Sequence, residues 1–140
     1  IVRPGGIYSN SSNILTKFLE GDHKIIFKTN HFTNRIHIED LTGIIFKIIK
    51  TENLDGIINA TDSFFIDNFD LIDKLSKKFS LPKPTKISYD DKSINKNIKS
   101  FYQVSKKVYS VRLINDLDYK FIYPRIDKFL NSLLKKEPNI

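Results

Sequence analysis

The sequence contains no cysteine and no long apolar run. The lack of cysteine excludes disulfide bonds and thiolate chemistry, and it is compatible with a reducing compartment. A membrane-spanning helix needs roughly 18 or more apolar residues in a row, and the sequence contains no such run. We also expect no signal peptide. With 140 residues, of which 40% are hydrophobic, the chain can bury the core of one domain. We expect a single cytoplasmic domain with no membrane partner.

Acidic residues are fewer than basic ones, which gives a formal net charge of +7. Such an excess can indicate nucleic-acid binding. The basic residues are mostly lysines scattered along the chain, with only short pairs such as Lys77-Lys78 and Lys106-Lys107. Scattered lysines are typical of a solvated surface, so nucleic-acid binding is the least favoured function.

Histidine is also scarce, and His23, His31 and His37 show no metal-ligand spacing with carboxylates. They form no recognisable nucleophile–base arrangement either. The sequence therefore predicts no metal site and no catalytic residue within this chain.

Hydrophobic periodicity predicts an α/β fold of short strands and about four to five helices, without repeats or linkers. Strands are expected at 1–3, 24–28, 34–38 and 56–60, an extended segment up to 87, and a short one at 107–109. Helices are expected after the 9–13 loop as far as Gly21, over 40–51, from Asp67 to the prolines at 82 and 84, from a Ser110 cap, and from Pro124 at a helix N1 position. Residues 90–99 are predicted as loop or weak helix.

The segment 34–41 (Asn-Arg-Ile-His-Ile-Glu-Asp-Leu) is the centre of the predicted fold. Period-two alternation places Arg35, His37 and Glu39 on one face of a strand. A helical period follows, and Asp40 is predicted to cap that helix and to meet the positive end of its dipole. Such a strand-to-helix corner is where open α/β folds place ligands.

This segment resembles the R-I-H-V-D-D-L segment of the extended and atypical short-chain dehydrogenase/reductases, the NAD-dependent epimerase/dehydratase family. Residues 1–8 (Ile-Val-Arg-Pro-Gly-Gly-Ile-Tyr) resemble the R-P-G-G-I-Y-G segment that precedes it in the same family. Weaker similarities follow at 56–62, 104–113 and 119–126. The resemblance covers nearly the whole chain and implies the C-terminal, substrate-binding part of a Rossmann-type protein.

Several family features are missing. The chain has no G-x-x-G-x-x-G after a strand, hence no dinucleotide pyrophosphate cradle. Tyr102 and Lys106 have the spacing of the family's Y-x-x-x-K pair, but we do not expect this match to be a catalytic pair. Residues 9–12 (Ser-Asn-Ser-Ser) replace the family's Gly-Pro-Gly-Arg. The sequence also begins with Ile1-Val2 inside a predicted strand, so we expect a fragment whose N-terminal nucleotide-binding half is absent.

The resemblance implies that Pro4, Gly5 and Gly6 pass the nicotinamide end of NAD or NADP in the full-length parent. The two glycines would allow positive φ and a close approach of backbone to ligand. The alternative is an ordinary turn that ends the strand. Tyr8 could contact substrate or could pack in the interior.

Asn34, Arg35 and His37 are the candidate substrate-binding residues of the central segment. The guanidinium of Arg35 could hold a phosphate or carboxylate through two parallel hydrogen bonds, or it could form a salt bridge with Glu39 or a nearby aspartate. His37 could instead be a hydrogen-bonded structural histidine.

The predicted function is therefore the substrate-binding portion of an NAD(P)-dependent epimerase/dehydratase or oxidoreductase, inactive alone and unable to bind the cofactor alone. The predicted substrate is a small molecule, for example a sugar nucleotide. The predicted partner is the missing Rossmann half. The alternative is a non-catalytic binding module derived from that fold. Strands at 1–3 and 56–60 should belong to a sheet whose other members are missing. This would leave an unpaired apolar edge, which favours self-association.

Overall fold

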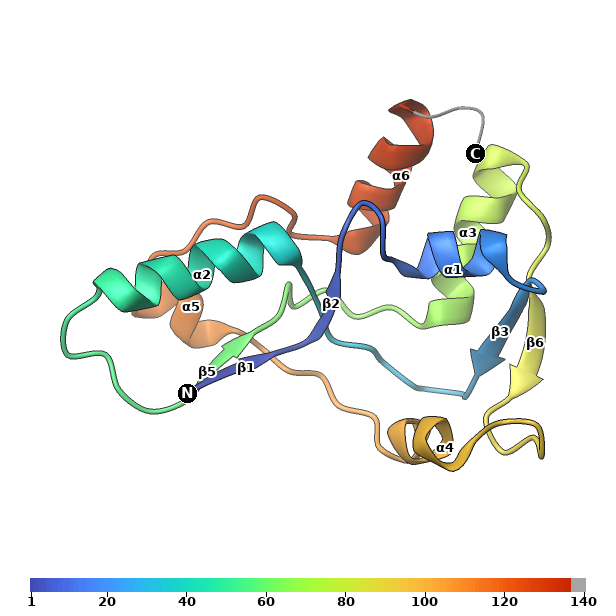
Figure 1. Cartoon of the computed structure of the whole chain (residues 1–140), viewed down its shortest axis with the longest axis horizontal. Coiled ribbons are helices and arrows are strands. Elements are labelled where there is room, and N and C mark those ends of the chain that lie inside the picture. The colour runs from blue at the N-terminus through green and yellow to red at the C-terminus, as the bar shows by residue number, and fades with distance from the viewer. Residues whose placement is uncertain (137–140) are drawn as a thin grey trace.

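A computed structural model describes residues 1–136 of the chain, and these residues form six short strands and six helices (Figure 1). The strands are β1 (Val2–Pro4), β2 (Gly6–Tyr8), β3 (Lys24–Phe27), β4 (Arg35–His37), β5 (Ile58–Ala60) and β6 (Thr85–Ser88). The helices are α1 (Ile14–Glu20), α2 (Ile38–Lys50), α3 (Asn68–Phe79), α4 (Lys96–Gln103), α5 (Val111–Asn115) and α6 (Ile126–Lys136).

The strands associate as three parallel pairs: β1 with β5, β2 with β4, and β3 with β6. Parallel strands need a long crossover between them, and each pair accordingly encloses at least one helix. β1 and β2 are separated by a single residue, Gly5, where the chain leaves one partner strand for another. The predicted sharing of a sheet by 1–3 and 56–60 is confirmed by the β1–β5 pair.

Two hydrophobic cores lie side by side along the molecule. One packs α1, α3 and α6 against β3 and is built from twelve buried residues such as Leu15, Leu71 and Leu130. The other packs α2 and α5 around β4 and β5 and centres on Ile36 and Ile44. Figure 1 shows α2, α5 and the β1–β5 pair on one side, and α1, α3, β3 and β6 on the other.

The structure corrects several predicted elements. Six helices occur in residues 1–136 where four to five were expected, because α4 extends beyond the weak 90–99 segment. Asn95 caps α4 by accepting from the Ile98 N–H at 2.9 Å, and the helix buries only Tyr102. A helix with one buried side chain leaves little apolar periodicity in the sequence.

Two predicted helix starts are also wrong. Ser110 does not cap α5, since its hydroxyl instead bonds to the backbone N–H and C=O of Thr61 at 2.8 and 2.9 Å. Pro124 lies two residues ahead of α6 and is not its first residue. The predicted cap of α3 is confirmed, because Asp67 Oδ1 accepts from the N–H groups of Phe69 and Asp70.

The corner at 34–41 turns earlier than predicted. α2 begins at Ile38, and its N-cap is His37, whose Nδ1 accepts from the Glu39 N–H at 3.3 Å. Glu39 therefore belongs to the helix, and its side chain is exposed. Arg35, Ile36 and His37 are all buried, so both faces of this strand are covered.

No helix within residues 1–136 has the length and apolar composition that crossing a membrane requires.

Candidate functional site

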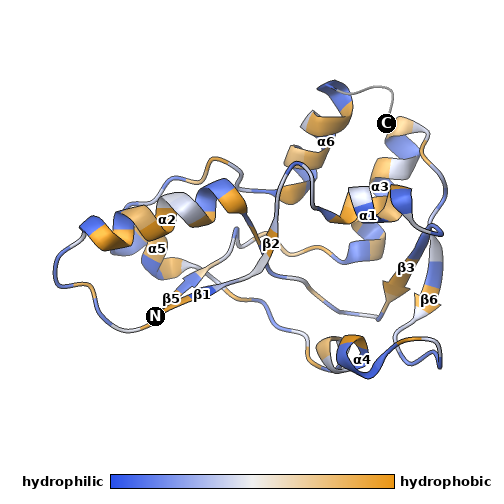
Figure 2. Ribbon diagram, in the orientation of Figure 1, coloured by the Kyte–Doolittle hydropathy of each residue, from blue (hydrophilic) through white to orange (hydrophobic). Residues whose placement is uncertain are grey.

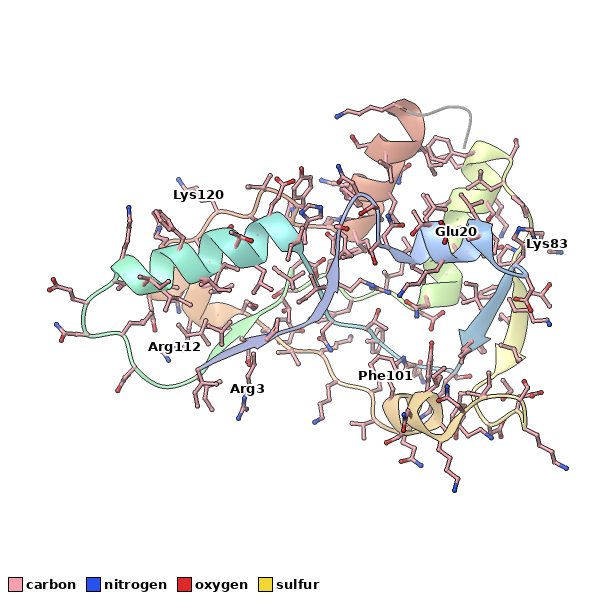
Figure 3. All side chains as sticks on the ribbon, viewed as in Figure 1. Arg3, Glu20, Lys83, Phe101, Arg112 and Lys120 are labelled. Atoms are coloured by element: carbon pink, nitrogen blue, oxygen red, sulfur yellow. The ribbon has the colours of Figure 1, made fainter. Side chains whose placement is uncertain are left out.

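A cleft of about 990 Å³ opens where β1 and β2 meet β4. Its wall includes the β1–β2 segment, the start of α1, the 31–35 segment and the 100–108 segment. Figure 3 labels two of its lining residues, Arg3 on β1 and Phe101 on α4. Six of the seven predicted site residues line this cleft, and His37 is the exception.

At Gly5, which lines the cleft, the chain changes its strand partner. The Gly5 N–H donates to the Ala60 carbonyl at 2.9 Å, whereas the Gly6 N–H donates to the Asn34 carbonyl at 2.7 Å. A Cβ on Gly5 would lie 2.8 Å from backbone atoms of Asn34. Neither glycine has positive φ, so that expectation was wrong. Gly5 is required for a close approach of two backbone segments of the protein itself.

Arg35 is buried, with 6% of its surface exposed, and lines the cleft. Its Nη1 donates to the Ile66 carbonyl at 3.3 Å, and its Nη2 donates to Asn68 Oδ1. Within residues 1–136 it forms no ion pair, so the alternative of a salt bridge with Glu39 is wrong. Burial lowers the pKa of Arg35 to about 10, against the influence of Asp62. The guanidinium stays charged at neutral pH.

Asn34 connects the cleft to the 106–108 segment. Its side-chain amide donates to the Lys106 carbonyl at 3.0 Å and accepts from the Val108 N–H at 2.7 Å. Both ends of the side chain are thus engaged within the protein. Asn34 fixes one wall of the cleft, which positions Lys106 at its edge.

His37 lies outside the cleft, in an aromatic cluster. Its ring centroid is 3.9 Å from that of Tyr123 and 5.1 Å from that of Tyr8. Burial lowers its pKa. Since Nδ1 accepts a hydrogen bond, the neutral ring carries its proton on Nε2, which is buried and has no partner. His37 is thus buried among aromatic rings and away from the cleft.

Tyr8 and Asp62 form a buried polar layer beside Arg35. Tyr8 is 4% exposed, and its hydroxyl has no partner in the described residues. Asp62 Oδ1 accepts from the Phe64 N–H at 3.0 Å, while Oδ2 is buried and unbonded. Burial raises the pKa of Asp62 to about 7, and burial together with Asp62 raises that of Tyr8. Arg35 lowers both values, so the three groups are electrostatically linked.

The charged side chains of the cleft all have one sign. Arg3, Lys17, Arg35 and Lys106 line it, and no Asp or Glu among the described residues does. A concave surface lined by one sign of charge concentrates ligands of the opposite sign. The arrangement can therefore hold an anion, with Arg35 as the buried contact and the other cations at the surface.

Tyr102, the tyrosine of the Y-x-x-x-K match, lies in the interior of the protein. Tyr102 is 5% exposed and stacks on His31, with ring centroids 4.4 Å apart. Its hydroxyl lies 3.4 Å from the Ile26 carbonyl, to which it donates. Tyr102 does not line the cleft, although Lys106 does.

Sequence reasoning missed Asp62, Asn68, Lys17 and Lys106 as parts of the site. Asp62 had a local signal, because it follows a buried strand directly. Asn68 had none, since it reaches Arg35 across 33 residues. Asp40, predicted as a helix cap, instead accepts from Tyr119, Ile122 and Tyr123.

Within residues 1–136, no group of three or more His, Asp or Glu side chains lies where it could hold a metal ion.

No protein-family model and no curated protein matches the sequence, but solved structures match its fold. A functionally unknown conserved protein from Silicibacter pomeroyi DSS gives a TM-score of 0.85 at 24% identity, over 96% of this chain and 48% of that chain. Human epimerase family protein SDR39U1 (isoform 2), solved with NADPH, gives 0.75 at 17% identity, over 99% and 48%. A putative NAD-dependent epimerase/dehydratase from Methylobacillus flagellatus gives 0.66 at 21% identity, over 99% and 47%.

The chain spans about half the length of each of these three proteins. At such identities the likeness is one of fold. The expected relation to the epimerase/dehydratase fold is confirmed at that level. Residues 1–136, with short parallel strands and six helices, have the α/β fold of about half of a short-chain dehydrogenase/reductase epimerase.

Proposed function

We propose that this chain is the C-terminal, substrate-binding half of an NAD(P)-dependent epimerase/dehydratase-like oxidoreductase. A Rossmann half supplies the cofactor site, and the chain described above closes over an anionic small-molecule substrate. The order of the family-like segments along the sequence supports the C-terminal assignment, since 1–8 and 34–41 occur in the family order.

The observation that carries the proposal is that Arg35 is a buried cation with no ion pair among residues 1–136. A buried cation without an ion pair is costly to stability. In this cleft the cost is removed when a ligand phosphate or carboxylate binds, because Arg can hold such a group through two parallel hydrogen bonds. The surrounding cations Arg3, Lys17 and Lys106 favour a ligand with more than one negative charge.

The 4–6 segment of the cleft can contact the nicotinamide ring of a dinucleotide but not its phosphates. The N–H groups of Gly5 and Gly6 already donate to Ala60 and Asn34, so they are not free to bind phosphates. Pro4 and Gly6 are exposed in the cleft and can contact a flat ring. Hydride transfer is chemistry that NAD or NADP supplies when bound. The chain alone should therefore be inactive and should bind the cofactor weakly.

A sugar nucleotide suits the cleft best. A solved structure of the same fold is the UDP-N-acetylglucosamine 4-epimerase from Bacillus cereus, with a TM-score of 0.67 at 11% identity over 99% of this chain and 45% of that chain. A diphosphate would meet Arg35 and the surface cations, and a volume of about 990 Å³ accommodates a ligand of that size. Tyr8, Asn34 and the 100–108 segment would shape the wall around the sugar.

A second candidate function is a non-catalytic binding module. It is favoured by the burial of Tyr102, which leaves the cleft without the tyrosine of the usual catalytic pair. In that case the cleft binds the same anions but supports no reaction. An upstream reading frame encoding a strand, G-x-x-G-x-x-G and a helix would favour the enzyme, and an upstream stop codon with a nearby start codon would favour the module.

Titration calorimetry on the isolated chain tests the proposal, with UDP-N-acetylglucosamine and NADPH as separate ligands. We expect the sugar nucleotide to bind and Arg35→Met to weaken it about tenfold or more, as the loss of a charge-assisted hydrogen bond requires. Arg112→Met, on α5 and outside the cleft, is the matched control and should leave binding unchanged. Equal binding by the Arg35 variant, or micromolar affinity for NADPH, would contradict the assignment.

A further inference from the structure

The carboxyl group of Asp62 is buried beside Arg35 but is not paired with it. The Asp62 N–H donates to the Arg35 carbonyl at 2.8 Å, so the two residues lie next to each other on adjacent segments. Asp62 is 7% exposed, its Oδ1 accepts only from the Phe64 N–H, and its Oδ2 is buried without a partner in residues 1–136. A buried carboxyl group with so few hydrogen bonds loses little by holding a proton.

The surroundings of Asp62 are apolar. Tyr8, from the same buried layer, belongs to one hydrophobic core, and Ile36, which follows Arg35, belongs to the other. Figure 2 shows hydrophobic residues on α2, α3 and α6, the helices that contribute to these two cores. Charges are weakly screened in such surroundings, so a change of charge on Asp62 acts strongly on Arg35.

The guanidinium of Arg35 still has hydrogen bonds to offer. Of its five N–H groups, one donates to the Ile66 carbonyl and one to Asn68 Oδ1, which leaves three without a partner in residues 1–136. The other Arg and Lys side chains that line the cleft are exposed. Arg35 is therefore the one buried cation that can serve both Asp62 and a bound anion.

An anion bound to Arg35 would oppose the ionisation of Asp62, because like charges that share a site raise the pKa of one of them. Burial already raises the pKa of Asp62 to about 7. Asp40 on α2 and Asp127 on α6 face it and raise its pKa further, while Arg35 on β4 lowers it. Tyr8 on β2 stays neutral, since burial raises the pKa of its hydroxyl.

We propose that the cleft binds its anionic ligand together with one proton, which the carboxyl group of Asp62 takes up from solvent. In the free protein near neutral pH, part of the molecules hold Asp62 ionised, and this carboxylate offsets the charge of Arg35. The bound anion replaces it as the counterion of Arg35, and Asp62 becomes neutral. Asp62 thus determines how strongly the cleft binds anions at a given pH. This inference rests on the proposed function, because it requires an anionic ligand at Arg35.

Asp67 is the other acid near Arg35 with an unbonded oxygen. Its Oδ1 caps α3, its Oδ2 is buried without a partner in residues 1–136, and burial raises its pKa. It lines a second cavity, of about 560 Å³, and not the cleft. Because Asn is also a good N-cap residue, Asp67→Asn keeps the cap and is the matched control for Asp62→Asn.

Titration calorimetry with UDP-N-acetylglucosamine between pH 6 and 8.5, in pairs of buffers with different ionisation heats, measures both affinity and proton uptake. The diphosphate diester of this ligand does not titrate in that range, so a linked proton belongs to the protein. From a pKa of about 7, the dissociation constant should rise at least about tenfold over this range, with about thirtyfold as the limit for one proton. More than about half a proton should be taken up per ligand at pH 8, and close to none at pH 6.

Asp62→Asn should bind at pH 8.5 about as tightly as at pH 6 and should take up no proton. Asp67→Asn should keep both the pH dependence and the uptake, and thermal unfolding of each variant checks that the fold persists. Uptake that survives Asp62→Asn, or that disappears in Asp67→Asn, would overturn the proposal. Binding by the parent with an affinity independent of pH would overturn it too and leave the proposed function standing, whereas no binding at any pH would overturn both.

Discussion

Replacement of Asp40 should weaken the fold more than replacement of any other acidic residue in a first helical turn. Asp40 has no exposed surface. Its Oδ1 accepts from the Tyr119 hydroxyl at 3.0 Å and from the Ile122 N–H at 2.8 Å, and its Oδ2 accepts from the Tyr123 N–H at 2.8 Å. One carboxylate thus fastens the 119–123 segment to α2.

The magnitude follows from these three bonds. Asp40→Asn keeps one acceptor oxygen and turns an NH₂ group towards a backbone N–H, so one charge-assisted bond is lost and two donors face each other. Hydrogen bonds to charged groups contribute about 1.5–3 kcal/mol, and an unsatisfied buried donor costs about 1–3 kcal/mol. We expect Asp40→Asn to lower the free energy of unfolding by about 2–4 kcal/mol, and Asp40→Ala by somewhat more.

Urea unfolding followed by far-UV circular dichroism measures the effect. With a slope of about 2 kcal/mol per molar urea, the midpoint should fall by about 1–2 M. Asp70→Asn is the control, because Asp70 occupies the first turn of α3 but is exposed, and it should change stability by less than about 0.5 kcal/mol. Trypsin should also cleave after Lys120 faster in the Asp40 variants. An Asp40→Asn protein as stable as the parent would refute this account of the segment.

Three further outcomes are expected. The native state retains a proton on Asp62 up to about pH 7, whereas the unfolded chain releases it near pH 4; the free energy of unfolding should therefore fall as the pH rises through that window. Asp62→Asn can still accept from the Phe64 N–H. It should remove this pH dependence and stabilise the protein at pH 7.5 by up to about 4 kcal/mol. If urea unfolding at pH 4.5 and 7.5 shows the same pH dependence in the variant, Asp62 is not its source. Gly5→Ala should cost about 1–3 kcal/mol, since its Cβ would meet rigid backbone of Asn34 at 2.8 Å, while Gly6→Ala, with 3.4 Å to the Asn34 carbonyl, should cost less than about 1 kcal/mol in the same assay.

Features with a local cause were predictable from the sequence. The Asp67 cap of α3 depends on N–H groups two and three residues away, and such short-range signals are visible in any window of sequence. The β1–β5 pair was predictable because both segments are short, apolar and bounded by turn residues. The gathering of Pro4 to Tyr8 with Asn34 and Arg35 was anticipated from the order of the family-like segments.

Features that depend on distant residues were not predictable. Asp40 reads as a helix cap because its partners lie 79 to 83 residues later in the chain. A histidine in the N-cap position, as at His37, is unusual, so the start of α2 was placed two residues late. Period-two alternation correctly separates the two sides of β4, but it does not show that aromatic rings cover one side and helices the other.

The three strand pairs have a consequence for how the polypeptide acquires its structure. Val2 pairs with Ile58, Gly6 with Arg35 and Lys24 with Thr85. None of the six strands in residues 1–136 therefore pairs with its partner through a short hairpin. Contacts between residues so far apart in sequence slow folding, because a long loop must close before any pair is formed. During synthesis β3 cannot complete its pairing with β6 until Ser88 has left the ribosome. The helices should consequently form early, and the sheet pairs should be the last parts of the molecule to gain protection from hydrogen exchange.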